Sequence, residues 1–148
     1  MKENRNLKRP SWDEYFLQIA EVVALRSVDA KTQVGCIIVD GDKRIVSTGY
    51  NGTPPGFDDS QIDWFQDTKH PYIIHAEQNA LIRADGLKLK NATLYCSYSP
   101  CSECAKNIAS AGIARVVYRN LYVDKKNQVQ GVDVLGLFGV DVLACLKE

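Results

Sequence analysis

The sequence predicts a single α/β domain over residues 1–148, with three layers arranged α-β-α around a mixed sheet of five strands. Two observations support this prediction. Stretches with apolar residues at helical spacing alternate with short β-branched runs, and the first two of these runs are joined by a turn as a hairpin. A chain of 148 residues can bury about two-thirds of its unfolded surface, so it needs no disulfide framework or structural metal to fold.

The first half of the chain predicts one helix and a hairpin. Ser11 is a suitable N-cap with Glu14 three positions later, and apolar residues repeat at helical spacing up to about residue 26. Strands are predicted at 34–39 and 44–50, joined by a turn at Asp40-Gly41. Because both runs are apolar on both faces, we expect both strands to be central in the sheet. The polar residues 1–10 are expected to form a flexible extension.

The second half predicts a long loop followed by alternating helices and strands. Residues 51–72 contain three prolines, two glycines and several aspartates, which favours a loop long enough to act as a lid or binding segment. Helices are predicted at 75–84, at 101–111 with Gly112 as terminator, and near 132–137. Strands are predicted at 92–97, 115–118 and 140–145.

The composition limits the classes of partner. The 18 basic and 18 acidic side chains give a formal net charge of zero, so no overall field attracts a nucleic acid polymer or an anionic membrane. No signal peptide and no apolar run of about 20 residues is present, which favours a cytoplasmic protein, in the host cytoplasm if the source is a virus. Five cysteines, an odd number, indicate reduced thiols and a metal site more than a disulfide framework.

Two short motifs carry the predicted chemistry. His75-Ala76-Glu77 opens one predicted helix, and Pro100-Cys101-Ser102-Glu103-Cys104 opens another. Cys101 and Cys104 are three positions apart on one helix face, so both thiols can reach one ion. With His75 they provide three zinc ligands, which leaves a fourth position open for water, as in catalytic zinc sites. This pair of motifs is typical of zinc-dependent nucleobase deaminases.

Glu77 is the predicted catalytic residue. Zinc lowers the pKa of a bound water to about 7, and a carboxylate two residues from His75 can move protons between that water and a ring nitrogen without binding the metal. Backbone N–H groups at the start of the Cys101 helix can stabilise the developing charge. The alternatives for the two cysteines are a redox pair or a structural zinc site, but neither has a use for Glu77.

The chain resembles the deoxycytidylate (dCMP) deaminases over nearly its whole length. The residues that carry this resemblance are Trp12–Phe16, Ala24–Ser27, Gln33–Cys36, Gly49–Gly52 with the following Pro54-Pro55-Gly56, Tyr72, His75–Ala80, Thr93–Tyr95 and Cys104–Lys106. The resemblance implies a cytidine-deaminase-like fold, conversion of dCMP to dUMP and ammonia, and a homohexamer. It also implies allosteric activation by dCTP and inhibition by dTTP.

The resemblance also implies substrate contacts. Asn51 would contact the deoxyribose, the backbone around Ser99 the amino group of the base, and Val34 with His75 the two faces of the ring. Tyr122 matches a family position near the 5′-phosphate. Arg26 and Ser27 precede the first strand and could supply charge and a donor to that phosphate. The alternatives are a solvated helix end for Arg26, a turn residue for Asn51 and a packed aromatic for Tyr122.

The nucleotide regulator is expected at Tyr50, Asn51, Gly52 and Thr53, with a Mg²⁺ ion accompanying its triphosphate. The alternative is that this loop merely shapes the mouth of the active site. Some phage members of the family bind a second zinc through a cysteine and a histidine inserted in this region. No cysteine occurs between Cys36 and Cys96, so we expect one zinc per subunit.

Two other functions remain open. A tRNA adenosine deaminase shares the zinc motifs, but such an enzyme should present a basic face, whereas Asp58, Asp59, Asp63 and Asp67 make this region acidic. The second alternative is a zinc-stabilised binding module without activity. Glu77 argues against that, because a purely structural site does not need it.

Overall fold

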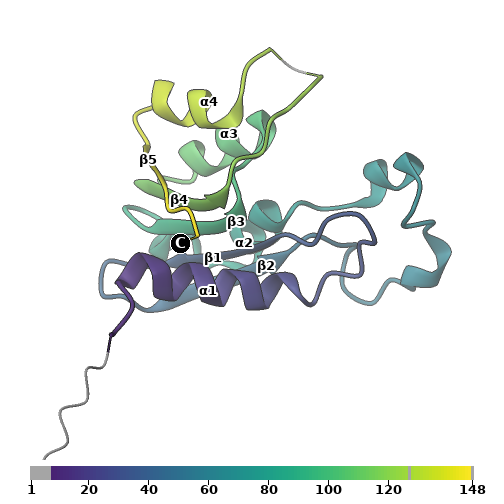
Figure 1. Cartoon of the computed structure of the whole chain (residues 1–148), viewed down its shortest axis with the longest axis horizontal. Coiled ribbons are helices and arrows are strands. Elements are labelled where there is room, and N and C mark those ends of the chain that lie inside the picture. Colours follow the sequence, from purple (N-terminus) through teal and green to yellow (C-terminus); the bar gives the residue numbers. More distant parts are fainter. Residues whose placement is uncertain (1–7, 127, 148) are drawn as a thin grey trace, which may run out of the picture.

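The computed structural model describes residues 8–126 and 128–147 as a five-stranded sheet with helices on both faces (Figure 1). Residues 1–7, most of the extension expected at the N-terminus, lie outside these described residues. The helices are α1 (Trp12–Ala24), α2 (Ala76–Arg83), α3 (Ser102–Ser110) and α4 (Gly131–Leu137). The strands are β1 (Gly35–Val39), β2 (Ile45–Tyr50), β3 (Thr93–Tyr98), β4 (Arg115–Asn120) and β5 (Asp141–Ala144).

The sheet is mixed and has the order β2-β1-β3-β4-β5. Strand β1 pairs antiparallel with both β2 and β3, whereas β3, β4 and β5 run parallel. The parallel part follows from the chain order, because α3 connects β3 to β4 and α4 connects β4 to β5. The predicted α/β class and the mixed five-stranded sheet are therefore confirmed.

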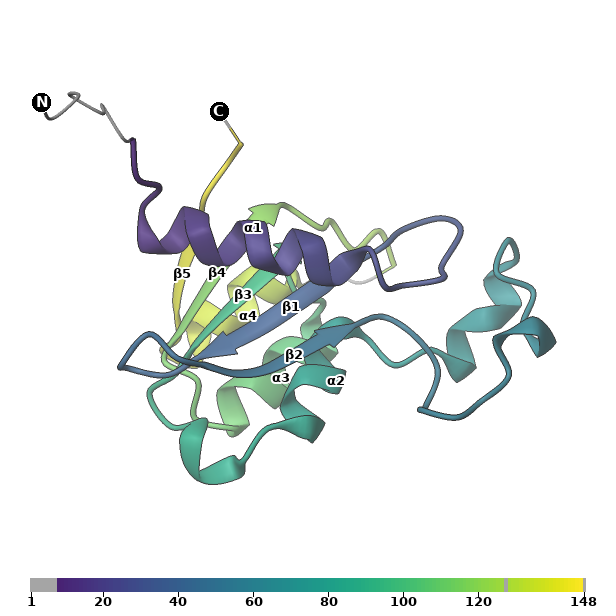
Figure 2. The same cartoon turned by 90° about the horizontal axis from the view of Figure 1, so that it is seen from below.

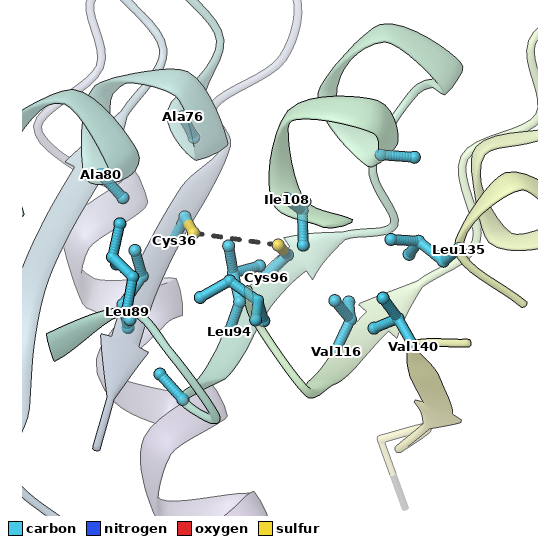
Figure 3. Close-up of a cluster of buried hydrophobic side chains, with 14 residues drawn as sticks. Cys36, Ala76, Ala80, Leu89, Leu94, Cys96, Ile108, Val116, Leu135 and Val140 are labelled. Carbon is cyan, nitrogen blue, oxygen red and sulfur yellow. Dashed lines mark hydrogen bonds between the residues drawn. The ribbon is translucent and has the colours of Figure 1, made fainter. Parts of the chain in front are cut away.

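The core has two layers of side chains, one on each face of the sheet. Helix α1 buries Phe16, Leu17 and Ala20 against β1, β3 and β4. Figure 2 shows α1 on one side of the sheet and α2 and α3 on the other. The second cluster lies under α2, α3 and α4 and includes Ile108 and Leu135 (Figure 3). This arrangement confirms the three predicted layers. No helix within the described ranges is long and apolar enough to cross a membrane.

The two strands of the hairpin differ in burial, and one prediction about them is wrong. All five residues of β1 are buried, as expected for a central strand. Strand β2 lies at the edge of the sheet, and Ile45 is 45% exposed. The apolar run at 44–50 therefore does not place β2 in the centre, because α2 and β1 cover only part of it and its other edge faces outward.

Residues 53–73 form a lobe that projects from the end of the sheet (Figures 1 and 2). A two-residue antiparallel bridge closes its base, because Gly52 and Ile74 exchange backbone hydrogen bonds of 3.1 and 2.8 Å. The predicted loop contains two short 3₁₀ helices, at Asp59–Gln61 and Asp67–Tyr72. The bridge sets the position of residue 75, the first residue of the His-x-Glu motif.

Helix α2 packs unusually close to strand β2, and Gly49 permits this approach. A Cβ atom at Gly49 would overlap with the carbonyl oxygen of Ala76 and lie 2.5 Å from the backbone nitrogen of Ala80. A side chain at this position would push α2 away from the sheet. Because α2 begins directly after His75, the same displacement would move the motif.

We therefore expect Gly49→Ala to lower the free energy of unfolding by about 1–3 kcal/mol, the usual cost of overpacking. Gly41→Ala is the matched control, because a Cβ atom at Gly41 has no neighbour within 4 Å. Urea denaturation of both variants and the wild type measures the difference. Equal stability of the two variants would show that the close approach of α2 is not constrained by Gly49.

Candidate active site

Two helices begin at one end of the sheet and bring the two motifs together. His75 is the N-cap of α2 and Cys101 is the N-cap of α3, so each motif starts just before a helix rather than inside it. The side chain of Gln78 accepts a hydrogen bond of 3.1 Å from the backbone N–H of His75, which fixes the start of α2. Pro100 lies one residue before the N-cap of α3.

The three predicted ligand atoms converge. Nδ1 of His75 lies 3.2 Å from Sγ of Cys104 and 3.5 Å from Sγ of Cys101. All three ligand atoms lie within 4.8 Å of one another. Zinc with tetrahedral bonds of about 2.3 Å to sulfur and 2.1 Å to nitrogen requires an N···S distance of about 3.6 Å. The observed distances are close to that value, so the cluster fits one zinc ion with Nδ1 as the histidine ligand.

Glu77 lies beside this cluster at the bottom of a cleft of about 320 Å³. The cleft is also lined by His75 and Cys101, and Glu77 is only 4% exposed. A second hollow of about 530 Å³ between α2 and α3 is lined by residues without titratable side chains, such as Leu81 and Ile82. The chemistry is therefore concentrated in the first cleft.

The protonation of the cluster follows from its geometry. The hydrogen bond with the Cys104 thiol is the main cause that lowers the pKa of Cys101 to about 4, against the opposing effect of burial. The same hydrogen bond, with burial, raises the pKa of Cys104. The pKa of His75 is raised, first by its hydrogen bond with Cys101, and burial raises the pKa of Glu77. A cation entering this site would displace protons from the sulfur and imidazole ligands.

The other cysteines are not part of the cluster. Cys36 and Cys96 face each other on β1 and β3 with their sulfur atoms 3.9 Å apart, fully buried in the core (Figure 3). Cys145 follows β5 and is partly exposed. Burial raises the pKa of Cys36 and Cys96, which keeps them as neutral thiols.

Four of the predicted substrate-binding residues line the cleft, and two do not. Val34, Asn51, Ser99 and Tyr122 are among the lining residues. Arg26 is exposed after the end of α1 and lies outside the lining. Ser27 is buried, and its hydroxyl donates a 2.8 Å hydrogen bond to the carbonyl oxygen of Asn51. Ser27 therefore stabilises the cleft wall but does not line the cleft.

Polar side chains of the cleft wall form hydrogen bonds with neighbouring backbone groups. The side-chain amide of Asn51 accepts from the backbone N–H of Val34 at 2.8 Å and donates to the carbonyl oxygen of Thr32 at 2.9 Å. The hydroxyl of Ser99 accepts from the backbone N–H of Tyr122 at 2.7 Å. Asn51 and Ser99 therefore fix the segments that carry Val34 and Tyr122.

The residues expected to bind the regulator lie at the junction of β2 and the lobe. The carbonyl oxygen of Tyr50 accepts a 2.8 Å hydrogen bond from the side chain of Asn79 on α2. Gly52 forms the bridge at the base of the lobe, and the hydroxyl of Thr53 donates to Asp59 at 2.7 Å. These contacts connect the expected regulatory segment to the helix that carries Glu77.

A buried ion pair that the sequence analysis missed ties the lobe to the cleft wall. Nζ of Lys69 lies 2.6 Å from Oδ1 of Asp29, and the two side chains are 2% and 7% exposed. Lys69 also donates to the carbonyl oxygen of Trp64 at 3.0 Å. Burial alone would raise the pKa of Asp29, but Lys69 and two backbone N–H groups outweigh it and lower that pKa. No local pattern signals a pair 40 residues apart in sequence.

We expect Lys69→Met to lower the free energy of unfolding by about 3–5 kcal/mol at neutral pH, because it leaves the Asp29 carboxylate buried without its partner. The pKa of Asp29 is lowered in the folded protein, so the stabilisation is present above pH of about 4 and is lost as the pH falls further. The difference between variant and wild type should therefore shrink below that pH. The control is Lys106→Met, which removes an exposed pair with Glu103.

Denaturation curves at several pH values measure this difference. A stability of Lys69→Met equal to that of the Lys106 control at neutral pH would contradict a structural role for the buried pair.

An α-β-α domain with a His/Cys/Cys cluster beside a buried glutamate is the arrangement of the zinc-dependent deaminases. The family model described as "Cytidine and deoxycytidylate deaminase zinc-binding region" matches residues 10–120. The chain belongs to this family.

Individual relatives agree with the family match. The deoxycytidylate deaminase of Homo sapiens is 42% identical over 113 residues, which are 72% of this chain and 64% of that protein. The chain thus spans about 64% of the length of the mammalian relatives that it matches. The deoxycytidylate deaminase of Mycobacterium phage D29 is 39% identical over 125 residues, 76% of this chain and 97% of that protein.

A solved structure confirms the predicted fold family. The dCMP deaminase from the cyanophage S-TIM5, in complex with dCMP and dUMP, superposes with a TM-score of 0.75 at 33% sequence identity. The match covers 93% of this chain and 98% of the cyanophage chain. The cytidine-deaminase-like fold expected from the resemblance is therefore confirmed over nearly the whole domain.

Proposed function

We propose that this protein is an enzyme that hydrolyses dCMP to dUMP and ammonia. The observation that carries the proposal is the placement of Glu77, 4% exposed, beside the His75, Cys101 and Cys104 cluster at the bottom of an open cleft. A purely structural metal site has no need of a buried carboxylate or of a cleft. The relatives named deoxycytidylate deaminase support dCMP as the substrate.

His75, Cys101 and Cys104 would hold one zinc ion per subunit. When bound, the ion would supply Lewis-acid chemistry, which can bring the pKa of a water molecule to about 7. Glu77 takes a proton from a water molecule and delivers it to N3 of the cytosine ring while the water oxygen bonds to C4. Glu77 then carries the second proton to the amino nitrogen, the C4–N bond breaks, and ammonia leaves as the C4 carbonyl forms. The sum is one water consumed and one ammonia released.

The cleft wall would orient the nucleotide. Val34 and His75 would flank the ring, and the backbone around Ser99 would accept from the amino group; all three residues line the cleft. Asn51 would contact the deoxyribose, although its amide already holds Val34 and Thr32. Tyr122 would donate to the 5′-phosphate. Arg26 and Ser27 lie off the lining, so their assignment to the phosphate has less support than that of Tyr122.

The alternative functions have less support. For a tRNA adenosine deaminase, a basic surface for the polymer would be expected, but the net charge is zero and the lobe carries Asp58, Asp63 and Asp67 on its surface. For a zinc module without activity, the burial of Glu77 beside the metal ligands would serve no purpose.

The central test is turnover of dCMP by the zinc-loaded protein. We expect the cytosine absorbance to fall with release of one ammonia per dUMP. Glu77→Gln should lower kcat by at least about 10³-fold while one zinc per chain remains bound, because the amide cannot carry protons. The control is Glu103→Gln, on the exposed face of α3. A change at Gln78 would not serve, because the side chain of Gln78 caps α2.

Absence of turnover by the zinc-loaded wild type would overturn the proposed reaction. Loss of zinc from Glu77→Gln would show that Glu77 is a ligand rather than the proton carrier.

We further propose that the enzyme is a homohexamer in the cytoplasm, activated by dCTP and inhibited by dTTP. The regulator and its Mg²⁺ ion would bind around Tyr50, Asn51, Gly52 and Thr53. Support comes from the connection of this segment to the catalytic helix, because Asn79 of α2 donates to the carbonyl oxygen of Tyr50. A nucleotide that shifts this segment would shift α2 and with it Glu77.

Regulation predicts a sigmoidal dependence of rate on dCMP that becomes hyperbolic with dCTP and is suppressed by dTTP. Asn79→Ala, which removes the contact with Tyr50, should weaken both nucleotide effects. Initial rates over a range of dCMP concentrations provide the measurement. Hyperbolic kinetics that neither nucleotide changes would remove the regulatory proposal and leave the reaction itself untouched.

A further inference from the structure

We propose that Lys31 provides the positive charge that makes this site select a 5′-phosphorylated nucleoside. The inference rests on the proposed deamination and assigns a specificity-determining residue to it. The inference follows from a comparison of the basic side chains that line the cleft. Some are neutralised by buried partners, and others remain accessible to a ligand.

The cleft is lined by a buried carboxylate, Glu77, at its floor and by an exposed lysine, Lys31, toward its mouth. Glu77 forms the floor, where it is 4% exposed, and it shares the lining with His75 and Cys101. Lys31 lines the same cleft, and its side chain is 51% exposed. A nucleotide whose base reaches the floor leaves its sugar and phosphate toward the mouth. Tyr122, which is exposed, lies on the same lining and can add a neutral hydrogen-bond donor.

The other basic groups of the lining are less suited. Lys69 is 2.6 Å from Asp29 with both side chains buried, so its charge is neutralised inside the protein. His70 carries a charge only when it is protonated. Among the described residues that line the cleft, Lys31 is thus the lysine with an exposed end. Arg26, the sequence-based candidate, lies outside the lining.

The backbone of Lys31 is fixed, although its side chain is exposed. Oδ1 of Asp29 accepts hydrogen bonds from the backbone N–H groups of Lys31 at 2.8 Å and of Thr32 at 3.3 Å. The buried carboxylate that neutralises Lys69 therefore also holds the backbone from which Lys31 extends. Figures 1 and 2 place this loop between α1 and β1 beside the lobe.

In the free protein, Lys31 has a partner that a phosphate can replace. Nζ of Lys31 lies 3.0 Å from Oδ1 of Asp67 on the lobe, and Asp67 is 81% exposed. Oδ1 of Asp67 also lies 3.7 Å from Nε2 of His70. Lys31 first, and Lys126 to a smaller extent, lower the pKa of Asp67. Exposed pairs of this kind contribute little to stability. A phosphate group with a charge of about −1.5 to −2 is a stronger partner for Lys31 than one carboxylate.

This exchange predicts effects of opposite sign for the two partners. Lys31→Met should raise KM for dCMP about 10-fold with little change in kcat, because a charged contact to the phosphate is lost. Asp67→Asn should lower KM about two- to threefold, because the competing carboxylate is removed. If the pair only supported the loop, removal of either partner would shift KM in the same direction.

The experiment measures kcat and KM for dCMP and for deoxycytidine, which lacks the phosphate. We expect deoxycytidine turnover to be unchanged by Lys31→Met. The dissociation constant of dCMP, measured by calorimetry in the Glu77→Gln background, should follow the same order as KM. Lys106→Met is the matched control, because Lys106 is 54% exposed and pairs with Glu103 at 2.9 Å outside the cleft.

An unchanged KM and dissociation constant in Lys31→Met, or changes in the same direction for Lys31→Met and Asp67→Asn, would overturn the proposal. These outcomes differ from a failure of the proposed function, in which the wild type would neither bind nor deaminate dCMP.

Discussion

The site depends on two helix N-termini that meet at one end of the sheet. The bridge between Gly52 and Ile74 fixes the position of His75, which caps α2, and Cys101 caps α3 after strand β3. The three ligand atoms therefore converge only if the two helices lie close together. Two glycines permit this. Gly49 lets α2 approach β2, and Gly131 lets α4 approach the carbonyl oxygen of Pro100, directly before Cys101. The convergence of the ligand atoms is therefore a consequence of close backbone packing directly beside His75 and Cys101.

Two lysine–aspartate pairs at the cleft illustrate how burial determines role. Lys69 and Asp29 are almost fully buried, so their separation would leave an uncompensated charge inside the protein, and they join the lobe to the wall. Lys31 and Asp67 are exposed and separate at little cost. Asp29 connects the two pairs through the backbone of Lys31. The buried pair therefore fixes the backbone that carries the exposed pair on the lining of the cleft.

Local patterns predicted most of the fold. The N-cap at Ser11, the runs of β-branched residues and the two motifs located the helices and strands to within a few residues, and the family resemblance was confirmed. The edge position of β2 was not predictable, because strand order depends on which neighbours cover a strand. The same applies to Lys69 with Asp29 and to buried Arg119, which pairs with Glu14 and Glu21 on α1. These partners lie 40 to 105 residues apart and leave no periodic signal.

Zinc K-edge absorption spectroscopy of the zinc-loaded protein tests the central claim most directly. The claim is that His75, Cys101 and Cys104 would hold one zinc ion and leave its fourth position to solvent. It predicts two sulfur ligands at about 2.3 Å, one imidazole nitrogen at about 2.0 Å and one further light atom from solvent. A spectrum with three or four sulfur ligands, or with no light atom besides one imidazole nitrogen, would contradict the claim.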